Sequence, residues 1–263
     1  MRLLKFTVFL AVLTIPATAY AWGPLTHVYL GSEILTVASL LPAGLYRLLK
    51  RFSEDFLYGN LMADSIIGKQ FLPRDMNTHT WDVAFDLMEA AETPQQQAFV
   101  YGYLSHLAAD TVAHGRLKGR RRYTGHTITE LKSDSLVGRK YWFMALAINR
   151  HVKKRNDLFL ESTLHSPFLS VKNNSRIYKG MVYLACLTPK RMNDFMDRNL
   201  LPPNIPTSKR IKKLHKESIE RIMNVLTRGE CSDVFGYDPF ANCSNSKFSH
   251  LIREINEGRS RKR

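Results

Sequence analysis

Hydrophobic residues along this chain recur mainly with the spacing of helices, and few stretches alternate as strands do. In the clearest case, 94–114, apolar side chains three and four positions apart make a broad surface: Phe99, Val100, Tyr103, Leu104, Leu107, Ala108 and Val112. Thr93 followed by Gln96 is typical of a capping box, and Pro94 suits the first helical position. Gly115 suits a left-handed stop after His114. The pattern therefore predicts a helix over 94–114.

Similar patterns predict further helices, and no linker divides the chain. Helical or apolar segments cover 25–41, 56–67, 79–91, 140–154, 170–187 and 208–227. Because no Pro/Gly/Ser-rich tract or repeat interrupts them, we expect an all-α fold in which 22–257 forms a single-domain multi-helix bundle. The segment 208–227 is apolar on one side and rich in Lys and Arg on the other. This is typical of a helix that packs on a core, and lying on an anionic membrane surface is the alternative.

Three polar residues interrupt the apolar surface of the 94–114 helix. His106, Asp110 and His114 recur every four residues, and His126 and Glu130 repeat that spacing on the next predicted helix. Four residues are slightly more than one turn, so such side chains project from nearly the same face. A buried His or Asp requires a partner, and zinc binds both imidazole nitrogens and carboxylate oxygens. Hydrogen-bonded core residues would explain one histidine, but the repeated spacing favours a metal site.

Other histidine and acidic residues leave alternatives open. His27, Asp64 and His79 lie in or beside apolar segments, where each could bind a metal, cap a helix or form a hydrogen bond in the core. Asp134 continues the four-residue series of the second helix and is an alternative ligand to Glu130.

The first 21 residues have the pattern of a signal peptide. Arg2 and Lys5 precede an apolar run over 6–15, and Ala19 and Ala21 fit the small-x-small rule for signal peptidase. A membrane anchor is the alternative, but the run is too short to span a bilayer. We therefore expect a secreted or periplasmic protein with Trp22 as its mature N-terminus. Loss of 1–21 would lower the net charge from +15 to +13, and the basic segment 258–263 is predicted to be a disordered tail.

Basic residues gather between the two predicted ligand helices: Arg116, Lys118, Arg120, Arg121 and Arg122. Such a run is usually a solvated loop. Because it joins the two halves of the predicted metal site, it also favours an anionic substrate through electrostatic steering.

Three cysteines remain after the signal peptide. Cys231 and Cys243 flank a loop and could form a disulfide in an oxidising compartment. Cys186 lies in an apolar stretch and is predicted to be a buried thiol, because the paired cysteines of thiolate zinc motifs are absent.

With these residues in order, the chain resembles the zinc-dependent phospholipase C family, which is similar in fold to the single-strand-specific zinc nucleases. The resemblance rests on the motif Tyr-Gly-Tyr-Leu-Ser-His-Leu-Ala-Ala-Asp at 101–110 and on the order of ligand types along the chain. That order is Trp22, His27, Asp64, His79, His106, Asp110, His114, His126 and Glu130. One spacing departs from the family, because three residues rather than five separate Asp110 from His114.

The resemblance implies an all-α phosphodiesterase with three zinc ions. It assigns the first ion to Asp64, His79, His106 and Asp110, the second to Trp22, His27 and a bridging Asp110, and the third to His114, His126 and Glu130. Asp64 is also its candidate general base. Zinc lowers the pKa of bound water, and paired ions stabilise both oxygens of an in-line displacement.

Three functions follow from this resemblance. We expect a monomeric phospholipase C that cleaves the glycerol-phosphate ester of phospholipids. A nuclease acting on nucleic acid is the alternative, because Trp22 and His27 have the nuclease spacing and a basic protein suits a polyanion. A secreted zinc-binding protein without hydrolytic activity is the third possibility.

Overall fold

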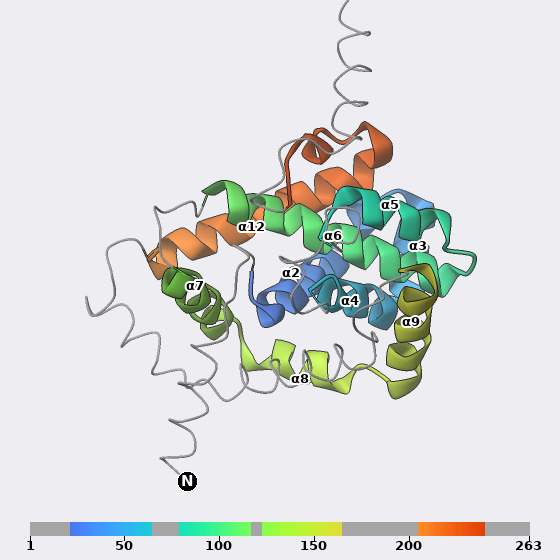
Figure 1. Cartoon of the computed structure of the whole chain (residues 1–263), viewed down its shortest axis with the longest axis horizontal. Coiled ribbons are helices and arrows are strands. Elements are labelled where there is room, and N and C mark those ends of the chain that lie inside the picture. The colour runs from blue at the N-terminus through green and yellow to red at the C-terminus, as the bar shows by residue number, and fades with distance from the viewer. Residues whose placement is uncertain (1–21, 65–78, 117–122, 165–204, 240–263) are drawn as a thin grey trace, which may run out of the picture.

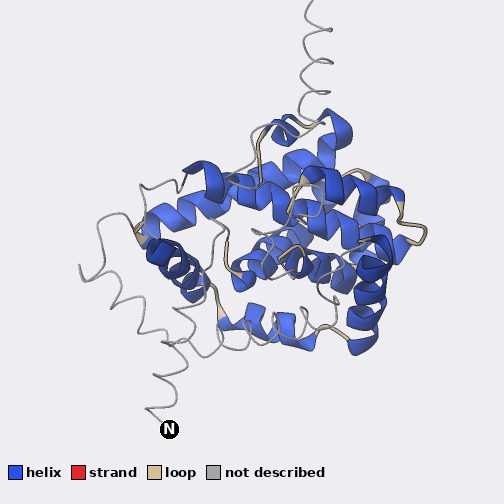
Figure 2. Cartoon of the chain, viewed as in Figure 1, coloured by secondary structure: helices blue, strands red, loops and turns tan. Residues whose placement is uncertain are grey.

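The computed structural model describes residues 22–64, 79–116, 123–164 and 205–239. Within these ranges every regular element is a helix, which confirms the predicted all-α class (Figure 2). None of the helices in these ranges is long and apolar enough to cross a membrane. The predicted signal peptide, the helix over 170–187, Cys186, Cys243 and the 258–263 tail all lie outside the described residues, so the pairing of Cys231 stays a prediction.

The longest helix, α6 (Pro94–Arg116), runs through the middle of the molecule (Figure 1). Helices α4 (Ser53–Met62), α12 (Ser208–Arg228) and α2 (Pro24–Thr36) pack against it. The remaining elements surround this centre: η1 (Ala38–Leu40), α3 (Ala43–Arg51), α5 (Trp81–Glu89), α7 (Tyr123–Leu136), α8 (Arg139–Ala147), α9 (Arg150–Thr163), η4 (Gly229–Cys231) and η5 (Asp233–Gly236).

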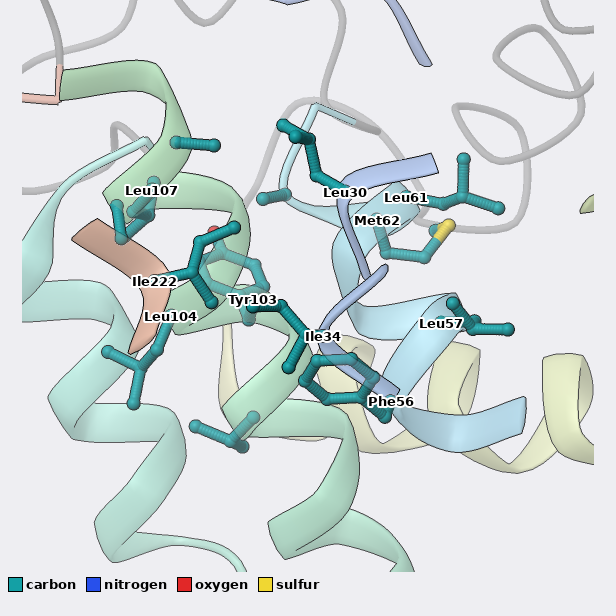
Figure 3. Close-up of a cluster of buried hydrophobic side chains, with 14 of the residues drawn as sticks. Leu30, Ile34, Phe56, Leu57, Leu61, Met62, Tyr103, Leu104, Leu107 and Ile222 are labelled. Atoms are coloured by element: carbon teal, nitrogen blue, oxygen red, sulfur yellow. The ribbon is translucent and has the colours of Figure 1, made fainter. Parts of the chain in front are cut away.

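The hydrophobic core forms where the central helices meet (Figure 3). Helix α2 contributes Leu30 and Ile34, α4 contributes Phe56 and Met62, and α12 contributes Ile222, all of them fully or almost fully buried. Tyr103, Leu104 and Leu107 of α6 complete the cluster. Burying one such large side chain stabilises the fold by about 1.5–3 kcal/mol, so this cluster holds α2 and α4 rigidly against α6.

Two glycines allow α4 and α6 to cross in close contact. A Cβ atom on Gly59 would lie 1.9 Å from the carbonyl oxygen of Phe99, and one on Gly102 would lie 2.0 Å from that of Phe56. These distances are far shorter than any real carbon contact, so only glycine fits at either position. Gly102 of the 101–110 motif is therefore required by helix packing, at the point where α4 and α6 cross.

Some predicted helix boundaries are confirmed and others are wrong. Thr93 and Gln96 form the predicted capping box, since the Thr93 N–H donates to Gln96 Oε1 (2.9 Å) and the Gln96 N–H donates to Thr93 Oγ1 (3.3 Å). Gly115 does not end α6, which reaches Arg116. There the Arg116 carbonyl accepts a hydrogen bond from Arg210 Nη2 of α12 (3.0 Å), so tertiary contacts support one more residue of helix.

Two long segments predicted as single helices are broken. The segment 25–41 ends as an α-helix at Thr36 and continues as η1. The segment 140–154 divides into α8 and α9 because Ile148 leaves the helical conformation, with a ψ of 127°. Asn149 then caps α9, its side chain accepting from the His151 N–H at 2.8 Å. Glu54 of α4 fixes this break by accepting from the Asn149 N–H at 2.8 Å.

Candidate metal centre

Helix α6 presents its histidines and its aspartate to the interior. His106, Asp110 and His114 are all buried, as the four-residue spacing predicts. Three other elements bring further ligand-type residues to this face. His27 comes from the first turn of α2, Asp64 follows the end of α4, and His79 precedes α5.

One group of possible ligands comprises His27, Asp64, His106 and Asp110, whose nearest nitrogen and oxygen atoms all lie within 4.8 Å of one another. Nε2 of His106 is 3.5 Å from Asp64 Oδ2 and 3.2 Å from Asp110 Oδ2. Nε2 of His27 is 3.3 Å from Asp110 Oδ1, and the rings of His27 and His106 stack with centroids 3.6 Å apart.

A second group comprises His79, Asp110 and His114, again within 4.8 Å. His79 Nε2 is 2.8 Å from Asp110 Oδ2 and also 3.6 Å from Asp64 Oδ1 and 3.1 Å from His106 Nε2. His79 thus stands between the two groups, and Asp110 belongs to both. This position suits a carboxylate that bridges two ions.

A backbone contact orients His106. Its Nδ1 is 2.8 Å from the carbonyl oxygen of Asn60 at the end of α4. A carbonyl only accepts hydrogen bonds, so Nδ1 carries the proton and the lone pair of neutral His106 is on Nε2, which faces the two carboxylates. This is the usual arrangement for a histidine that binds metal.

The charges at the site shift the pKa values of its members. Burial lowers the pKa of His106, but Asp64 and Asp110 outweigh burial and raise that pKa to about 9. Burial would raise the pKa of Asp110, but His27 and His106 hold it well below its usual range. The negative charges of Asp64 and Asp110 are therefore stable only with positive charge beside them. Protons on the histidines or a bound cation would supply that positive charge.

The chemistry of this cluster fits zinc. Its donors are imidazole nitrogens and carboxylate oxygens, and ligands bound at 2.0–2.1 Å in a tetrahedron lie about 3.3 Å apart. The distances joining His106, Asp64 and Asp110 are close to that value. Neither ring nitrogen of His27 makes a hydrogen bond of good geometry to a described residue, although both are buried. A buried polar nitrogen without a partner destabilises the fold, and coordination to a metal ion would remove that cost.

The comparisons with known proteins agree with this geometry. The family model described as "Zinc dependent phospholipase C" matches residues 26–171, more than half of the chain. This chain belongs to the zinc-dependent phospholipase C family. An uncharacterized protein of Archaeoglobus fulgidus is 30% identical over 123 residues, which are 45% of this chain and 33% of that protein. The chain thus spans only a third of that relative's length, and no solved structure matches.

Family membership and the His/Asp groups together support a zinc-dependent phosphodiesterase. Zinc is the metal that both observations favour. The structure brings together the set that the resemblance assigned to the first ion, because His79 Nε2 lies 2.8–3.6 Å from atoms of Asp64, His106 and Asp110. It also places His27 beside Asp64 and His106, and His114 beside His79 and Asp110. Which residues share an ion stays a prediction.

Trp22 lies beside the centre with its indole buried. Its main-chain nitrogen is 3.0 Å from Asp110 Oδ1. The indole Nε1 donates to the Ala109 carbonyl (3.1 Å) and to Ser218 Oγ of α12 (3.0 Å). His215 of the same helix packs edge-on against the indole, with ring centroids 4.9 Å apart. The amine that cleavage after Ala21 would create therefore lies within reach of the cluster.

The residues assigned to the third ion are only partly described. Glu130 is half-buried on α7 and belongs to neither of the two groups found among the described residues. The side chain of His126 lies outside them, so the third ion stays a prediction.

Asp134, the open alternative to Glu130, also belongs to neither of the two groups and lies against another helix. Its carboxylate accepts hydrogen bonds at the start of α2, including one from the Thr26 N–H at 2.8 Å. Burial raises the pKa of Asp134, and the hydrogen bonds from Thr26 and Leu25 lower it. Burial has the larger effect, so the pKa is raised to about 7.

Of the predicted substrate-binding residues, only Arg116 is described. Its side chain is 59% exposed, and its Nε donates to Glu217 Oε1 of α12 at 3.1 Å. Lys118, Arg120, Arg121 and Arg122 lie outside the described residues, and their role stays a prediction.

Sequence reasoning missed the contribution of α12. His215 and Ser218, which lie on the side of the helix opposite its Lys and Arg residues, contact the Trp22 indole. A signal was present, because both residues are polar positions on the apolar face defined by Ile211, Leu214 and Ile222. Asn60 had no signal, because it acts through its main-chain carbonyl.

Proposed function

We propose that this chain is a secreted, zinc-dependent phospholipase C that hydrolyses the glycerol-phosphate ester of phospholipids. The observation that carries the proposal is the buried cluster around Asp110 in a chain of this family. Bound zinc would polarise the phosphodiester and lower the pKa of water. The protein's part is to hold the ligands in place and to remove a proton.

Asp64 is the residue best placed to take that proton. Its side chain is 16% exposed, whereas those of His79, His106 and Asp110 are fully buried. A general base must lie within hydrogen-bond reach of the water molecule that it deprotonates. Of these four side chains, only that of Asp64 is both part of the cluster and accessible to water. Its carboxylate lies 3.5–3.6 Å from His106 and His79, so it stays within the cluster while it faces outward.

An enzyme that acts on phospholipids must bind to the surface of a membrane, and helix α12 offers a basic surface for such binding. The first nine residues of α12 carry five exposed cations: Lys209, Arg210, Lys212, Lys213 and Lys216. Each basic residue near an anionic bilayer contributes about 1 kcal/mol to binding. This surface supports an encounter with an anionic membrane, and it suits nucleic acid equally well.

The decisive experiment has two stages. Hydrolysis of a bis-aryl phosphodiester, with chelator and with zinc restored afterwards, separates a zinc enzyme from a zinc-binding protein without activity. Phosphatidylcholine vesicles, with and without anionic lipid, are then compared with single-stranded DNA. We expect release of the phosphorylated headgroup from vesicles and little cleavage of DNA. Preferential cleavage of DNA would replace this proposal with the nuclease, and no zinc-dependent hydrolysis at all would refute both enzymes.

A further inference from the structure

The carboxylate of Asp134 lies across the N-terminus of α2. Oδ1 accepts hydrogen bonds from the Thr26 N–H and from Thr26 Oγ1, each at 2.8 Å, and Oδ2 accepts from the Leu25 N–H at 3.3 Å. Helix α2 needs such a partner, because its own N-cap residue, Gly23, has no side chain to accept from the first turn. A carboxylate at this end also interacts favourably with the helix dipole.

Gly23 is required by this contact rather than by its backbone conformation. Its φ of −68° and ψ of 159° suit any residue. A Cβ atom at this position would nevertheless lie 2.4 Å from the Asp134 carboxylate. Asp134 can therefore cap α2 in this position only because residue 23 is glycine and leaves room for the carboxylate.

The same contact links α2 to two other helices. Thr26 Oγ1 is 2.8 Å from Ser133 Oγ of α7, and Ser133 Oγ is 2.9 Å from His215 Nε2 of α12. His215 in turn packs against the Trp22 indole. A continuous buried network therefore joins the capping carboxylate to the residue that precedes Gly23.

We propose that Asp134 is a positioning residue, which places Trp22 and His27 at the metal centre by holding the first turn of α2. Trp22 directly precedes the capped turn, and His27 directly follows Thr26. Both residues approach the same oxygen of Asp110, at 3.0 and 3.3 Å, so a small shift of this turn would move two ligands together. The inference rests on the proposed zinc centre but not on the identity of the substrate.

The test measures zinc affinity, by competition with a chromogenic chelator at pH 8, in the form that begins at Trp22. Asp134→Asn keeps one acceptor oxygen but places an amide N–H group against the donors of α2. Residues that orient metal ligands typically change affinity about 10–100-fold when replaced. We expect Asp134→Asn to weaken zinc binding about tenfold and Asp134→Ala to weaken it further.

The matched control is Asp55→Asn, the same change at another buried carboxylate. Asp55 accepts from Arg155 Nη2 (2.6 Å) and Asn156 Nδ2 (2.7 Å) and joins α4 to α9, away from the start of α2. It should lower thermal stability and leave zinc affinity near wild type.

A double substitution tests the mechanism directly. Gly23→Ala should weaken zinc binding in the wild-type background, where the new methyl group meets the carboxylate. It should add little in the Asp134→Ala background, where that space is free. This dependence would show that the new methyl group acts through its contact with the Asp134 carboxylate.

Three results would overturn the inference. The first is wild-type zinc affinity in folded Asp134→Asn, and the second is an equal loss in Asp55→Asn. The third is a Gly23→Ala effect of the same size in both backgrounds. A wild-type protein that binds no zinc would instead refute the metal centre itself, and the inference would fall with it.

Discussion

At the scale of single residues, Asp110 is a buried carboxylate with several nitrogen atoms close to it. It is fully buried and lies within 3.3 Å of nitrogens from His27, His79 and His106. Its negative charge is stable there because those rings, or ions that they bind, surround it. The main-chain nitrogen of Trp22 adds a fourth contact at 3.0 Å. No other described carboxylate belongs to both groups of possible ligands.

We therefore predict that Asp110→Asn removes zinc binding and activity together. The amide keeps the shape of the side chain but loses the charge that two nearby dications require. Zinc per chain should fall sharply in elemental analysis, and kcat/KM should drop by more than about 100-fold, beyond the usual effect of a residue that only orients ligands. The control is Asp86→Asn, on the exposed side of α5, which should change neither quantity. Full zinc content in Asp110→Asn would show that this residue is not central.

A second prediction at this scale concerns the amine of Trp22. A free α-amine has a pKa of about 8, so zinc can displace its proton at neutral pH, whereas an amide nitrogen cannot bind in this way. A chain beginning at Trp22 should bind more zinc, and hydrolyse phosphodiesters faster, than one beginning at Ala21. Both forms can be released from the same tagged precursor and compared by zinc content and diesterase rate. Equal values would exclude the amine as a ligand, and the indole contacts would then be its only role.

At the scale of elements, the crossing of α4 and α6 connects packing to the site. Gly59 and Gly102 bring each helix against the backbone of the other. One residue after Gly59, the Asn60 carbonyl accepts the hydrogen bond that orients His106. Separation of the two helices would therefore weaken the core and also release this ring.

We predict that Gly59→Ala or Gly102→Ala lowers both stability and zinc affinity. Overpacking costs about 1–3 kcal/mol, and more where the obstacle is backbone. In a chain of this size, about 2–4 °C of Tm is lost for each kcal/mol. Gly44→Ala is the control, because nothing lies within 4 Å of its Cβ and alanine favours a helix by up to about 1 kcal/mol. A Gly102→Ala protein with unchanged Tm would contradict the close crossing.

At the scale of the whole molecule, positive charge dominates. The net charge of +15 attracts any polyanion, and the exposed cations of α12 continue the basic character of the end of α6, where Arg116 contacts this helix. Such a field acts on the rate of encounter more than on the chemical step, and salt weakens it.

We predict that replacing Arg120, Arg121 and Arg122 together with Ser lowers kcat/KM about tenfold at low salt and little at high salt, because exposed charges are screened beyond about 10 Å at 0.1 M. The Tm should barely change. The matched control removes three exposed cations of α3, Arg47, Lys50 and Arg51, which lie at the other side of the molecule from α7 (Figure 1). The steering role is wrong if the two triple variants show the same salt dependence.

The sequence by itself determined the features that depend on neighbours along the chain. The all-α class followed from hydrophobic spacing, and the start of α6 followed from Thr93, Pro94 and Gln96. The shared face of His106, Asp110 and His114 followed from the pitch of one helix. In each case the chain neighbours alone set the geometry, so local rules were sufficient.

Only the tertiary structure decided what depends on the approach of distant segments. It placed the Asp134 carboxylate against the start of α2, and it brought His114 together with His79. It also brought Ser218 of α12 to Trp22. A carboxylate at a given sequence position can cap one helix or bind a metal on another with equal local plausibility. Which of the two it does is settled by helix packing, through contacts between residues that are 108 and 196 positions apart in the sequence.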